Sequence, residues 1–315
     1  MKKIRAAVVG VGYLGRFHAQ KYAALDSCEL VGVVDARVEA REKVAGELGT
    51  QAFADYHELI GRVDAVSVAT TTPAHFAIAK DFLSAGVHVL VEKPITETPE
   101  QARELIALAK AKRCVLQVGH LERFNPTILA AESHLSRPNF IECHRLAPFK
   151  ERGTDVNVVL DLMIHDIDIV QTIVGAPIAS IDAIGTKVFS EEIDIANARI
   201  RFENGCVCNA TASRVSFKTE RKLRVFVDDA YLSLDLQQKI LTVIRKRGDA
   251  PAGQLPASIE EQNFDQGDAL KAEIESFLDC IRTGKAPIVG GEAGMRALET
   301  AMRITEQVQR GAKTR

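Results

Sequence analysis

The chain has 315 residues, which is enough to bury a large core and to form two domains. Its 40 basic and 42 acidic residues nearly balance, and they form no basic, aromatic-studded patch, so nucleic acid is not an expected partner. The longest apolar runs fall short of a membrane helix or a signal-peptide core, and the six cysteines form no CxxC pair, so we expect a cytoplasmic protein with free thiols.

The first 120 residues alternate between short β-rich runs and helical patterns of ten or more residues. The β-rich runs are Ile4–Val9, Leu30–Val34, Ala65–Ala69, His88–Val91 and Cys114–Val118. Their nearly continuous apolar character is typical of parallel strands that are covered on both faces. The alternation predicts βαβ units, and therefore an α/β domain over residues 1–121 with a doubly wound parallel sheet.

Two helices of this domain begin with clear signals. Thr72 is predicted to cap a helix whose first residue is Pro73 and which ends at Gly86. Residues 98–101, Thr-Pro-Glu-Gln, form a capping-box pattern ahead of apolar residues at helical spacing.

The pattern changes after residue 121. A long helical pattern runs from Asn157 to Val174, and strand patterns joined by the turns Asn204-Gly205 and Asp228-Asp229 follow from Ile178 onward. A polar loop at about 248–266 precedes two closing helices. We expect residues 122–315 to form a second α/β domain with an open, mainly antiparallel sheet. An open sheet face needs cover, which favours a homodimer or homotetramer.

The first strand runs into Gly10-Val11-Gly12-Tyr13-Leu14-Gly15, a G-x-G-x-x-G turn that opens a helix. In such a turn the backbone approaches a pyrophosphate, and the helix N-terminus offers N–H groups to it. The next strand ends at Asp35, 20 residues beyond Gly15, where a carboxylate binds the ribose hydroxyls of NAD and repels the 2′-phosphate of NADP. Arg37 leaves both possibilities open, because it can stack on adenine or tolerate that phosphate. A purely structural glycine turn is the competing interpretation.

Two further segments follow strand ends. Thr70-Thr71-Thr72-Pro73 comes after one strand, and Glu92-Lys93-Pro94 comes after the next. Ligands of such sheets bind beyond the carboxyl ends of the strands, which places Lys93 near a nicotinamide. The residues expected to contact NAD are Gly10, Gly12, Tyr13, Leu14, Gly15, Asp35, Ala36, Arg37, Ala69, Thr70, Thr71, His75, Glu92 and Lys93.

Asp161, His165 and Asp168 have the spacing of one helix face, within an otherwise apolar helix. Buried charges need a partner or a purpose, which favours a functional role. An equally good alternative is a solvent-exposed helix face on which Asp161 and His165 form an ordinary i, i+4 pair. Metal binding is a third interpretation, but no further set of ligands at short spacing supports it, so we expect no metal site.

These motifs together resemble the glucose–fructose oxidoreductase / inositol dehydrogenase / MocA (Gfo/Idh/MocA) family over essentially the whole chain. The resemblance is carried by the glycine turn, Glu92-Lys93-Pro94, the segment 119–126 and Asp161-x-x-x-His165. It implies an N-terminal Rossmann domain, a C-terminal α/β domain whose open sheet forms the oligomer interface, and the catalytic trio Lys93, Asp161 and His165.

Residues 119–126, Gly-His-Leu-Glu-Arg-Phe-Asn-Pro, and residues 161–168 also resemble the bacterial UDP-N-acetylglucosamine 3-dehydrogenases. That likeness implies a sugar-nucleotide substrate, oxidation to a 3-keto sugar in a route to lipid A, and a downstream aminotransferase. A diphosphate would need cations, for which Arg123, Lys150 and Arg152 are candidates. The residues expected at the substrate are Arg123, Phe124, Asn125, Arg152, Asp161 and His165.

Oxidation of a secondary alcohol needs a base for the hydroxyl proton and an acceptor for the hydride. A neutral imidazole suits the first task, so His165 is a candidate base, which Asp161 would orient. Lys93 would stabilise the developing negative charge or would itself be the base. A dehydrogenase of free sugars or inositols, and an NAD-binding sensor without chemistry, are the alternative functions.

Overall fold

The computed structural model describes residues 3–150, 156–248, 256–264 and 266–313. The chain forms two compact units, one from residues 1–121 and 268–296 and the other from residues 122–267 and 297–315. The sequence patterns had placed all of residues 122–315 in one domain, whereas the structure assigns residues 268–296 to the first unit.

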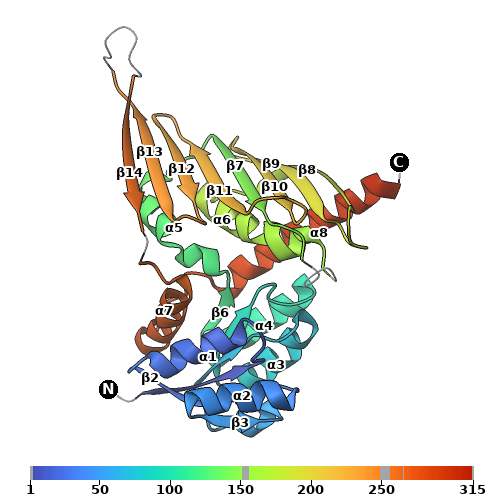
Figure 1. Ribbon diagram of the computed structural model, residues 1–315, viewed down its shortest axis with the longest axis vertical. Coiled ribbons are helices and arrows are strands. Elements are labelled where there is room, and N and C mark those ends of the chain that lie inside the picture. Colours follow the sequence, from blue (N-terminus) through green and yellow to red (C-terminus); the bar gives the residue numbers. More distant parts are fainter. Residues whose placement is uncertain (1–2, 151–155, 249–255, 265, 314–315) are drawn as a thin grey trace. The chain divides into compact units, whose positions relative to one another are not determined.

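The first unit contains a six-stranded parallel sheet with the order β3-β2-β1-β4-β5-β6 (Figure 1). The strands are β1 (Ile4–Val9), β2 (Cys28–Val34), β3 (Gln51–Phe53), β4 (Ala65–Val68), β5 (His88–Glu92) and β6 (Leu116–Gly119). Since the order runs outward from β1 in one direction and from β4 in the other, right-handed crossovers place the helices of the β1–β3 half on one face and those of the β4–β6 half on the other. The predicted doubly wound sheet is confirmed; only the three-residue strand β3 had no sequence signal.

The helices of this unit are α1 (Gly15–Ala24), α2 (Val38–Leu48), α3 (Thr72–Ser84), α4 (Pro99–Lys112) and α7 (Ala269–Thr283). The capping box of α4 is confirmed, because Thr98 and Gln101 each accept a hydrogen bond from the other's backbone N–H group. Helix α3 begins one residue earlier than predicted, so that Thr71, and not Thr72, is its N-cap.

Helix α7 belongs to the first unit because of its apolar face. Ile274, Phe277 and Leu278 have helical i, i+3, i+4 spacing and are almost completely buried. They share a hydrophobic core with Ala19 and Tyr22 of α1. This packing explains why a segment that comes after residues 122–267 of the second unit belongs to the first unit.

The second unit contains an eight-stranded sheet with the order β14-β13-β12-β11-β7-β10-β9-β8. Its strands are β7 (Phe140–Leu146), β8 (Ile178–Thr186), β9 (Ile195–Phe202), β10 (Val207–Ser213), β11 (Glu220–Phe226), β12 (Ala230–Asp235), β13 (Ile240–Lys246) and β14 (Ala257–Asn263). Strands β7 and β10 are parallel, and the other adjacent pairs of this sheet are antiparallel. The prediction of an open, mainly antiparallel sheet is therefore confirmed.

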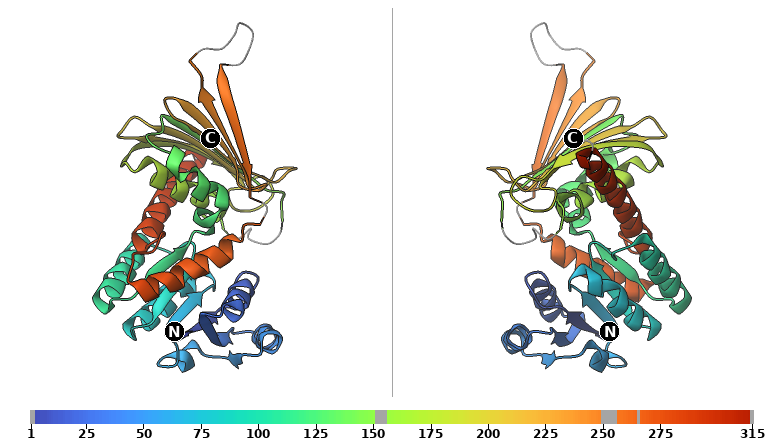
Figure 2. Two further views of the ribbon diagram at one scale, coloured as in Figure 1. Left: turned by 90° about the vertical axis from the view of Figure 1, so that its left-hand side faces the viewer. Right: turned by 90° about the vertical axis from the view of Figure 1, so that its right-hand side faces the viewer.

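The predicted polar loop at 248–266 is wrong in part, since β14 occupies Ala257–Asn263 and pairs with β13. Most of the β14 side chains are exposed, as on an edge strand, so the strand lacks the alternation that would reveal it. The edge strand projects beside β13 in both views of Figure 2.

The helices of the second unit are α5 (Pro126–Ala131), α6 (Ile164–Val174) and the end of α8 (Gly291–Lys313). A π-helical turn at Val159–Met163 leads directly into α6, where the sequence predicted one continuous α-helix from Asn157. Helix α6 packs on β7 and β10, and its apolar residues join the core of this unit.

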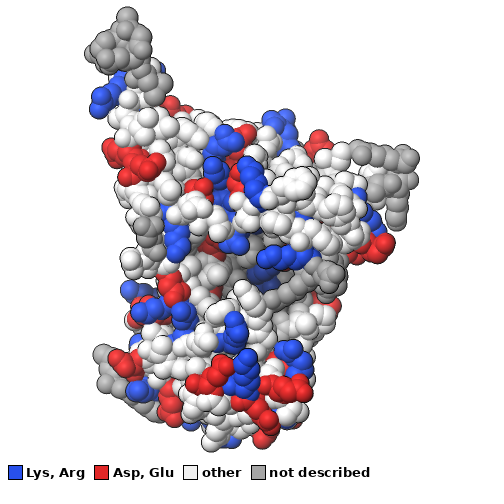
Figure 3. All heavy atoms as spheres, in the orientation of Figure 1, with Lys and Arg blue, Asp and Glu red and all other residues white. Residues whose placement is uncertain are grey.

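Acidic and basic side chains are interspersed over the face of the molecule that Figure 3 displays. Among the described residues, no helix has the length and apolar character needed to cross a lipid bilayer.

Candidate functional site

The glycine turn lies at the carboxyl end of β1, where the backbone is too crowded for side chains. Gly10 has φ +87°, and a Cβ there would lie 2.8 Å from the backbone of Ala69. A Cβ on Gly15 would lie 1.8 Å from the carbonyl oxygen of Gly10. Both glycines are therefore required by the protein's own packing.

Gly12 differs from these two glycines. A Cβ at this position would meet only the Arg37 side chain, at 3.7 Å, so the protein itself leaves space there. The space lies beside the N-terminus of α1, whose first N–H groups favour an anion. The contacts of the protein itself therefore do not require glycine at position 12, and the space there is suited to a ligand that approaches the backbone, as a pyrophosphate does.

Asp35, at the end of β2, is tied to this turn. One carboxylate oxygen accepts a hydrogen bond from the backbone N–H of Val11 at 3.0 Å, and the other accepts from the N–H of Arg37 at 3.0 Å. The Arg37 side chain is exposed and reaches the same carboxylate, with 3.4 Å between Nε and Oδ1. A carboxylate so fixed next to a phosphate-binding turn is suited to the hydroxyls of a ribose.

The loops after β4 and β5 are joined through His75. Its ring nitrogens face two carbonyl oxygens, of Thr70 at 3.2 Å and of Pro94 at 2.9 Å. Burial lowers the pKa of His75, although both carbonyl groups act in the opposite direction. The two loops that carry Thr70 and Lys93 are therefore held together at the carboxyl edge of the sheet. The Lys93–Pro94 peptide bond is cis.

The remaining residues expected at the cofactor divide by exposure. Tyr13 is 60% exposed, and its ring lies edge-on to Phe17 at 5.6 Å. Ala36 and Thr71 are exposed, whereas Leu14, Ala69 and Lys93 are half-buried and Glu92 is buried. All of these residues belong to the first unit.

Asp161 and His165 lie in the second unit and are both half-buried. Asp161 is in the π-helical turn, so the regular α-helical spacing that the sequence predicts between Asp161 and His165 does not hold there. Asn157 starts this turn, because its Oδ1 atom accepts from the N–H groups of Val159 and Leu160. π-Helical turns are frequent at functional sites.

Asp168 is buried, whereas Asp161 and His165 are half-buried, and it has a partner within the second unit. The Arg123 guanidinium lies 3.6 Å from its carboxylate and donates to the hydroxyl of Thr172 at 2.6 Å. The cation of Arg123, which was expected at a diphosphate, is thus engaged within the second unit.

Two other residues expected at the substrate are also buried in this unit. Phe124 is part of its interior, and Asn125 caps α5 while donating to the carbonyl oxygen of Leu236 at 3.0 Å. Lys150 is exposed. Arg152 lies outside the described residues.

A buried ion network around Arg145 was not predicted. Arg145 donates to both oxygens of Asp166, at 3.0 and 2.7 Å, and to Glu122 at 2.9 Å. These carboxylates raise the pKa of Arg145 despite its burial. Burial would raise the pKa of Glu122, but Arg145 and Arg221 lower it overall. The network joins β7 to α6 through Asp166, one residue beyond the Asp161–His165 segment, and no sequence spacing links its members.

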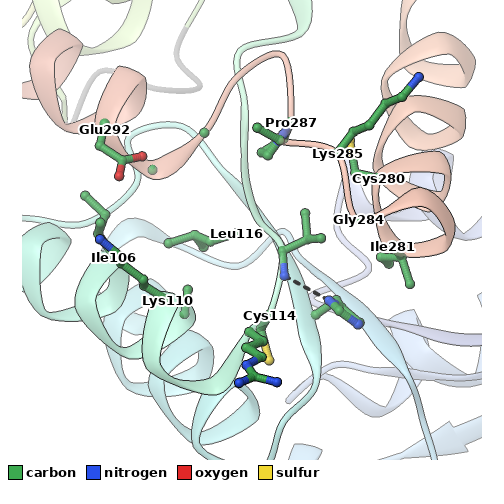
Figure 4. A pocket seen from close by; sticks show the side chains of 17 residues that line it. Ile106, Lys110, Cys114, Leu116, Cys280, Ile281, Gly284, Lys285, Pro287 and Glu292 are labelled. Atoms are coloured by element: carbon green, nitrogen blue, oxygen red, sulfur yellow. Dashed lines mark hydrogen bonds between the residues drawn. The ribbon is translucent and has the colours of Figure 1, made fainter.

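A pocket of about 570 Å³ lies elsewhere in the first unit (Figure 4). It is lined by residues next to the amino ends of β5 and β6, including His88 and Leu116, and by residues around the end of α7, including Gly284 and Lys285. In the wall of this pocket, His88 accepts a hydrogen bond from the backbone N–H of Val115 at 2.8 Å. Since ligands of doubly wound sheets bind at the carboxyl ends of the strands, this pocket is separate from the candidate site.

The geometry of the first unit fits a dinucleotide, and comparisons with known proteins agree with it. Residues 4–120 match the family described as "Oxidoreductase family, NAD-binding Rossmann fold", and residues 143–314 match "Oxidoreductase family, C-terminal alpha/beta domain". A UDP-N-acetylglucosamine 3-dehydrogenase from Acidithiobacillus ferrooxidans is 39% identical over 310 residues, covering 98% of each chain. Its solved structure matches with a TM-score of 0.93. A scyllo-inositol 2-dehydrogenase from Bacillus subtilis is 26% identical, covering 98% of this chain and 95% of its own.

Proposed function

Because the chain belongs to the Gfo/Idh/MocA family of oxidoreductases, whose two domains it matches in order, we propose that it oxidises carbon 3 of UDP-N-acetylglucosamine to the 3-keto sugar with NAD. The observation that supports this substrate most strongly is the 39% identity to a dehydrogenase of that name, which extends over 98% of both chains. The segments 119–126 and 161–168, which resemble the same enzymes, are consistent with it.

NAD as the cofactor is supported by the first unit. The open space at Gly12 suits the pyrophosphate, and the Asp35 carboxylate at the end of β2 suits the adenosine ribose. A 2′-phosphate would meet the negative charge of Asp35, which disfavours NADP. Bound NAD supplies the acceptor for the hydride.

The protein's own residues have to manage the hydroxyl proton and the charge on the reacting oxygen. We assign these tasks to Lys93 and His165, with Asp161 as a partner for the imidazole or for a neighbouring hydroxyl. Lys93 follows β5 in the loop that His75 holds, and its ammonium group suits an oxygen that is becoming negative. Either His165 or Lys93 takes the proton, and kinetic measurements separate the two.

The test is NADH formation by the purified chain with NAD and UDP-N-acetylglucosamine, followed by absorbance. Lys93→Ala and His165→Ala are expected to lower kcat by at least about 100-fold while NAD still binds. Lys80→Ala is the matched control for Lys93, because Lys80 is a half-exposed lysine of the same unit that pairs with Glu104. Normal turnover in Lys93→Ala or His165→Ala removes that residue from the assignment.

A second candidate function is the dehydrogenation of a free sugar or inositol. It is favoured by the 26% identical inositol dehydrogenase. A panel of inositols, glucose and uronic-acid nucleotides discriminates the two, because only the sugar-nucleotide function requires the UDP group. A non-catalytic NAD sensor would bind NAD and reduce none of it with any member of the panel.

We further propose that the enzyme is cytoplasmic and works as a homodimer or homotetramer through its open sheet. A keto sugar is the substrate of aminotransferases, so an aminotransferase is the class of enzyme that would consume the product. Adding such an enzyme with glutamate should increase NADH formation if the oxidation alone is unfavourable.

A further inference from the structure

Three buried polar side chains lie close together inside the first unit, and one of them belongs to the residue that directly precedes Lys93. They are His18 of α1, Glu92 of β5 and Glu273 of α7. One ligand-type atom of each lies within 4.8 Å of the others, and their exposed fractions are 0%, 8% and 0%. The sequence gives no indication of this cluster, since its members come from widely separated segments.

His18 connects Glu92 to two hydroxyl groups. Its Nε2 atom lies 3.0 Å from Oε1 of Glu92, and its Nδ1 atom lies 3.1 Å from Oγ of Ser67. The hydroxyl of Tyr22 lies 2.9 Å from the same Oγ. An ionised Glu92 only accepts hydrogen bonds, so Nε2 donates to it, and a chain of donors from Tyr22 through Ser67 then completes the imidazole's contacts.

Glu273 has no such partners. Both of its carboxylate oxygens are buried, and neither accepts a hydrogen bond from a donor group, although a carboxylate oxygen of Glu92 lies within 4.8 Å. Burial, and then the charge of Glu92, raise the pKa of Glu273 well above its ordinary value. Among the described residues, the titratable groups next to it are Glu92 from β5 and His18 and Tyr22 from α1. Two ionised carboxylates so close together in a buried site would repel each other, so the pair needs a proton or a bound cation.

We propose that Glu273 carries a proton and donates a hydrogen bond to Glu92, and that it thereby positions the backbone of Lys93. Glu92 is the link, because its Oε2 atom accepts from the N–H of Lys93 at 3.3 Å. The carboxyl group is also confined by Gly119, where a Cβ would lie 2.8 Å from it. Helix α7 is anchored in turn, since Gln117 donates to the carbonyl oxygen of Glu273 at 3.1 Å.

The role of Glu273 as a positioning residue rests on the proposed function of Lys93, but its protonation does not. Infrared spectroscopy of the purified chain in heavy water at neutral pD tests the protonation directly. The wild type should show the C=O band of a buried carboxylic acid, and Glu273→Gln should lack it. A spectrum of Glu273→Gln identical to that of the wild type in this region overturns the proposal.

Kinetics test the positioning. Glu273→Gln can still donate to Glu92, so its kcat should stay within about threefold of the wild type. Glu273→Met has a similar length but no donor, and its kcat should fall at least about tenfold, with the dissociation constant of NAD unchanged. Its Tm should stay equal or rise, because a buried polar group has been removed. Glu275→Met is the control, as Glu275 lies on the same helix and is 50% exposed. A Glu273→Met enzyme with normal kcat overturns the positioning role.

A bound cation is the other way to balance the two carboxylates, because His18, Glu92 and Glu273 also offer the donor atoms of a metal site. Elemental analysis of the protein after dialysis against Zn²⁺, Mn²⁺ or Mg²⁺ decides between the two. If the wild type binds one equivalent of metal and Glu273→Gln does not, the proposed proton on Glu273 is overturned. If the wild type binds no metal, the result supports that proton. The infrared and metal measurements do not depend on activity. If the wild type is inactive on every substrate, the proposed function fails, but the protonation of Glu273 can still be tested.

Discussion

Arg145 provides a direct test of how the second unit holds its buried charges. Its guanidinium contacts Asp166 through two hydrogen bonds of 3.0 and 2.7 Å and Glu122 through one of 2.9 Å. The side chains of Arg145, Asp166 and Glu122 are only 4%, 5% and 10% exposed. Arg145→Met would leave two carboxylates without their main partner, and breaking a buried pair in this way costs about 3–5 kcal/mol.

For a unit of this size, 1 kcal/mol corresponds to a change in Tm of about 2–4 °C, so Arg145→Met should lower the Tm by about 6–20 °C at pH 7. Calorimetry measures this change. In the variant, the carboxyl groups of Asp166 and Glu122 would have higher pKa values in the folded state than in the unfolded state. The variant therefore loses stability as the pH rises through these folded-state pKa values. The deficit relative to the wild type should therefore shrink as the pH is lowered from 7 towards 5.

Arg221 is the matched control. It contacts the same Glu122 at 3.2 Å, but its side chain is 46% exposed, so Arg221→Met should cost less than about 1 kcal/mol. The double variant Arg145→Met, Asp166→Leu should regain more than half of the lost stability, because it removes one unpaired buried charge. A Tm for Arg145→Met equal to that of Arg221→Met would refute the reasoning.

Three further predictions concern single residues. Asp35→Ser should lower the affinity for NAD by about 10- to 100-fold, because hydrogen bonds to a charged group are lost, and it should raise the affinity for NADP relative to NAD. Fluorescence titration with both cofactors measures this preference. An unchanged preference would contradict the assignment of Asp35 to the ribose. Gly15→Ala should abolish NAD binding and lower the Tm, because its Cβ would lie 1.8 Å from the Gly10 carbonyl oxygen; wild-type NAD affinity would show that the turn adapts. Asp194 is buried, which raises its pKa, but hydrogen bonds from Ser190 and the preceding N–H groups outweigh burial and bring the pKa down to about 2. Asp194→Asn should therefore lower the free energy of unfolding by about 2 kcal/mol at pH 7. This difference is present above the pKa of the unfolded state and is lost as the pH falls from about 4 towards 2. Urea unfolding of the wild type and the variant over that pH range measures the difference, and a value that does not change with pH would contradict the charge as its source.

Local signals in the sequence were sufficient for much of the first unit. The capping box at Thr98 and the glycine turn before α1 depend on residues a few positions apart, so their patterns are complete in the sequence. Strand β14 had no such pattern, because an edge strand with exposed side chains on both faces shows no alternation. The π-helical turn at Val159–Met163 was also missed, since its apolar residues fit an α-helix equally well.

The candidate site was predictable only where its residues follow strand ends or share a segment. Asp35 and Lys93 could be named in this way, because the carboxyl edge of a parallel sheet is where ligands bind. Glu273 could not, since residues 122–267 of the second unit separate α7 from the earlier part of the first unit in the sequence. Arg145 and Asp166 were equally hidden, because their pairing depends on how α6 packs on β7.

The most direct test of the account is NADH formation from NAD and UDP-N-acetylglucosamine by the purified chain, with a partner aminotransferase and glutamate added in parallel. We predict that NADH appears with this substrate and that Lys93→Ala eliminates it. No NADH with this nucleotide, but NADH with an inositol or another sugar, would contradict the proposed substrate. No NADH with any member of the panel would contradict the proposed dehydrogenation itself.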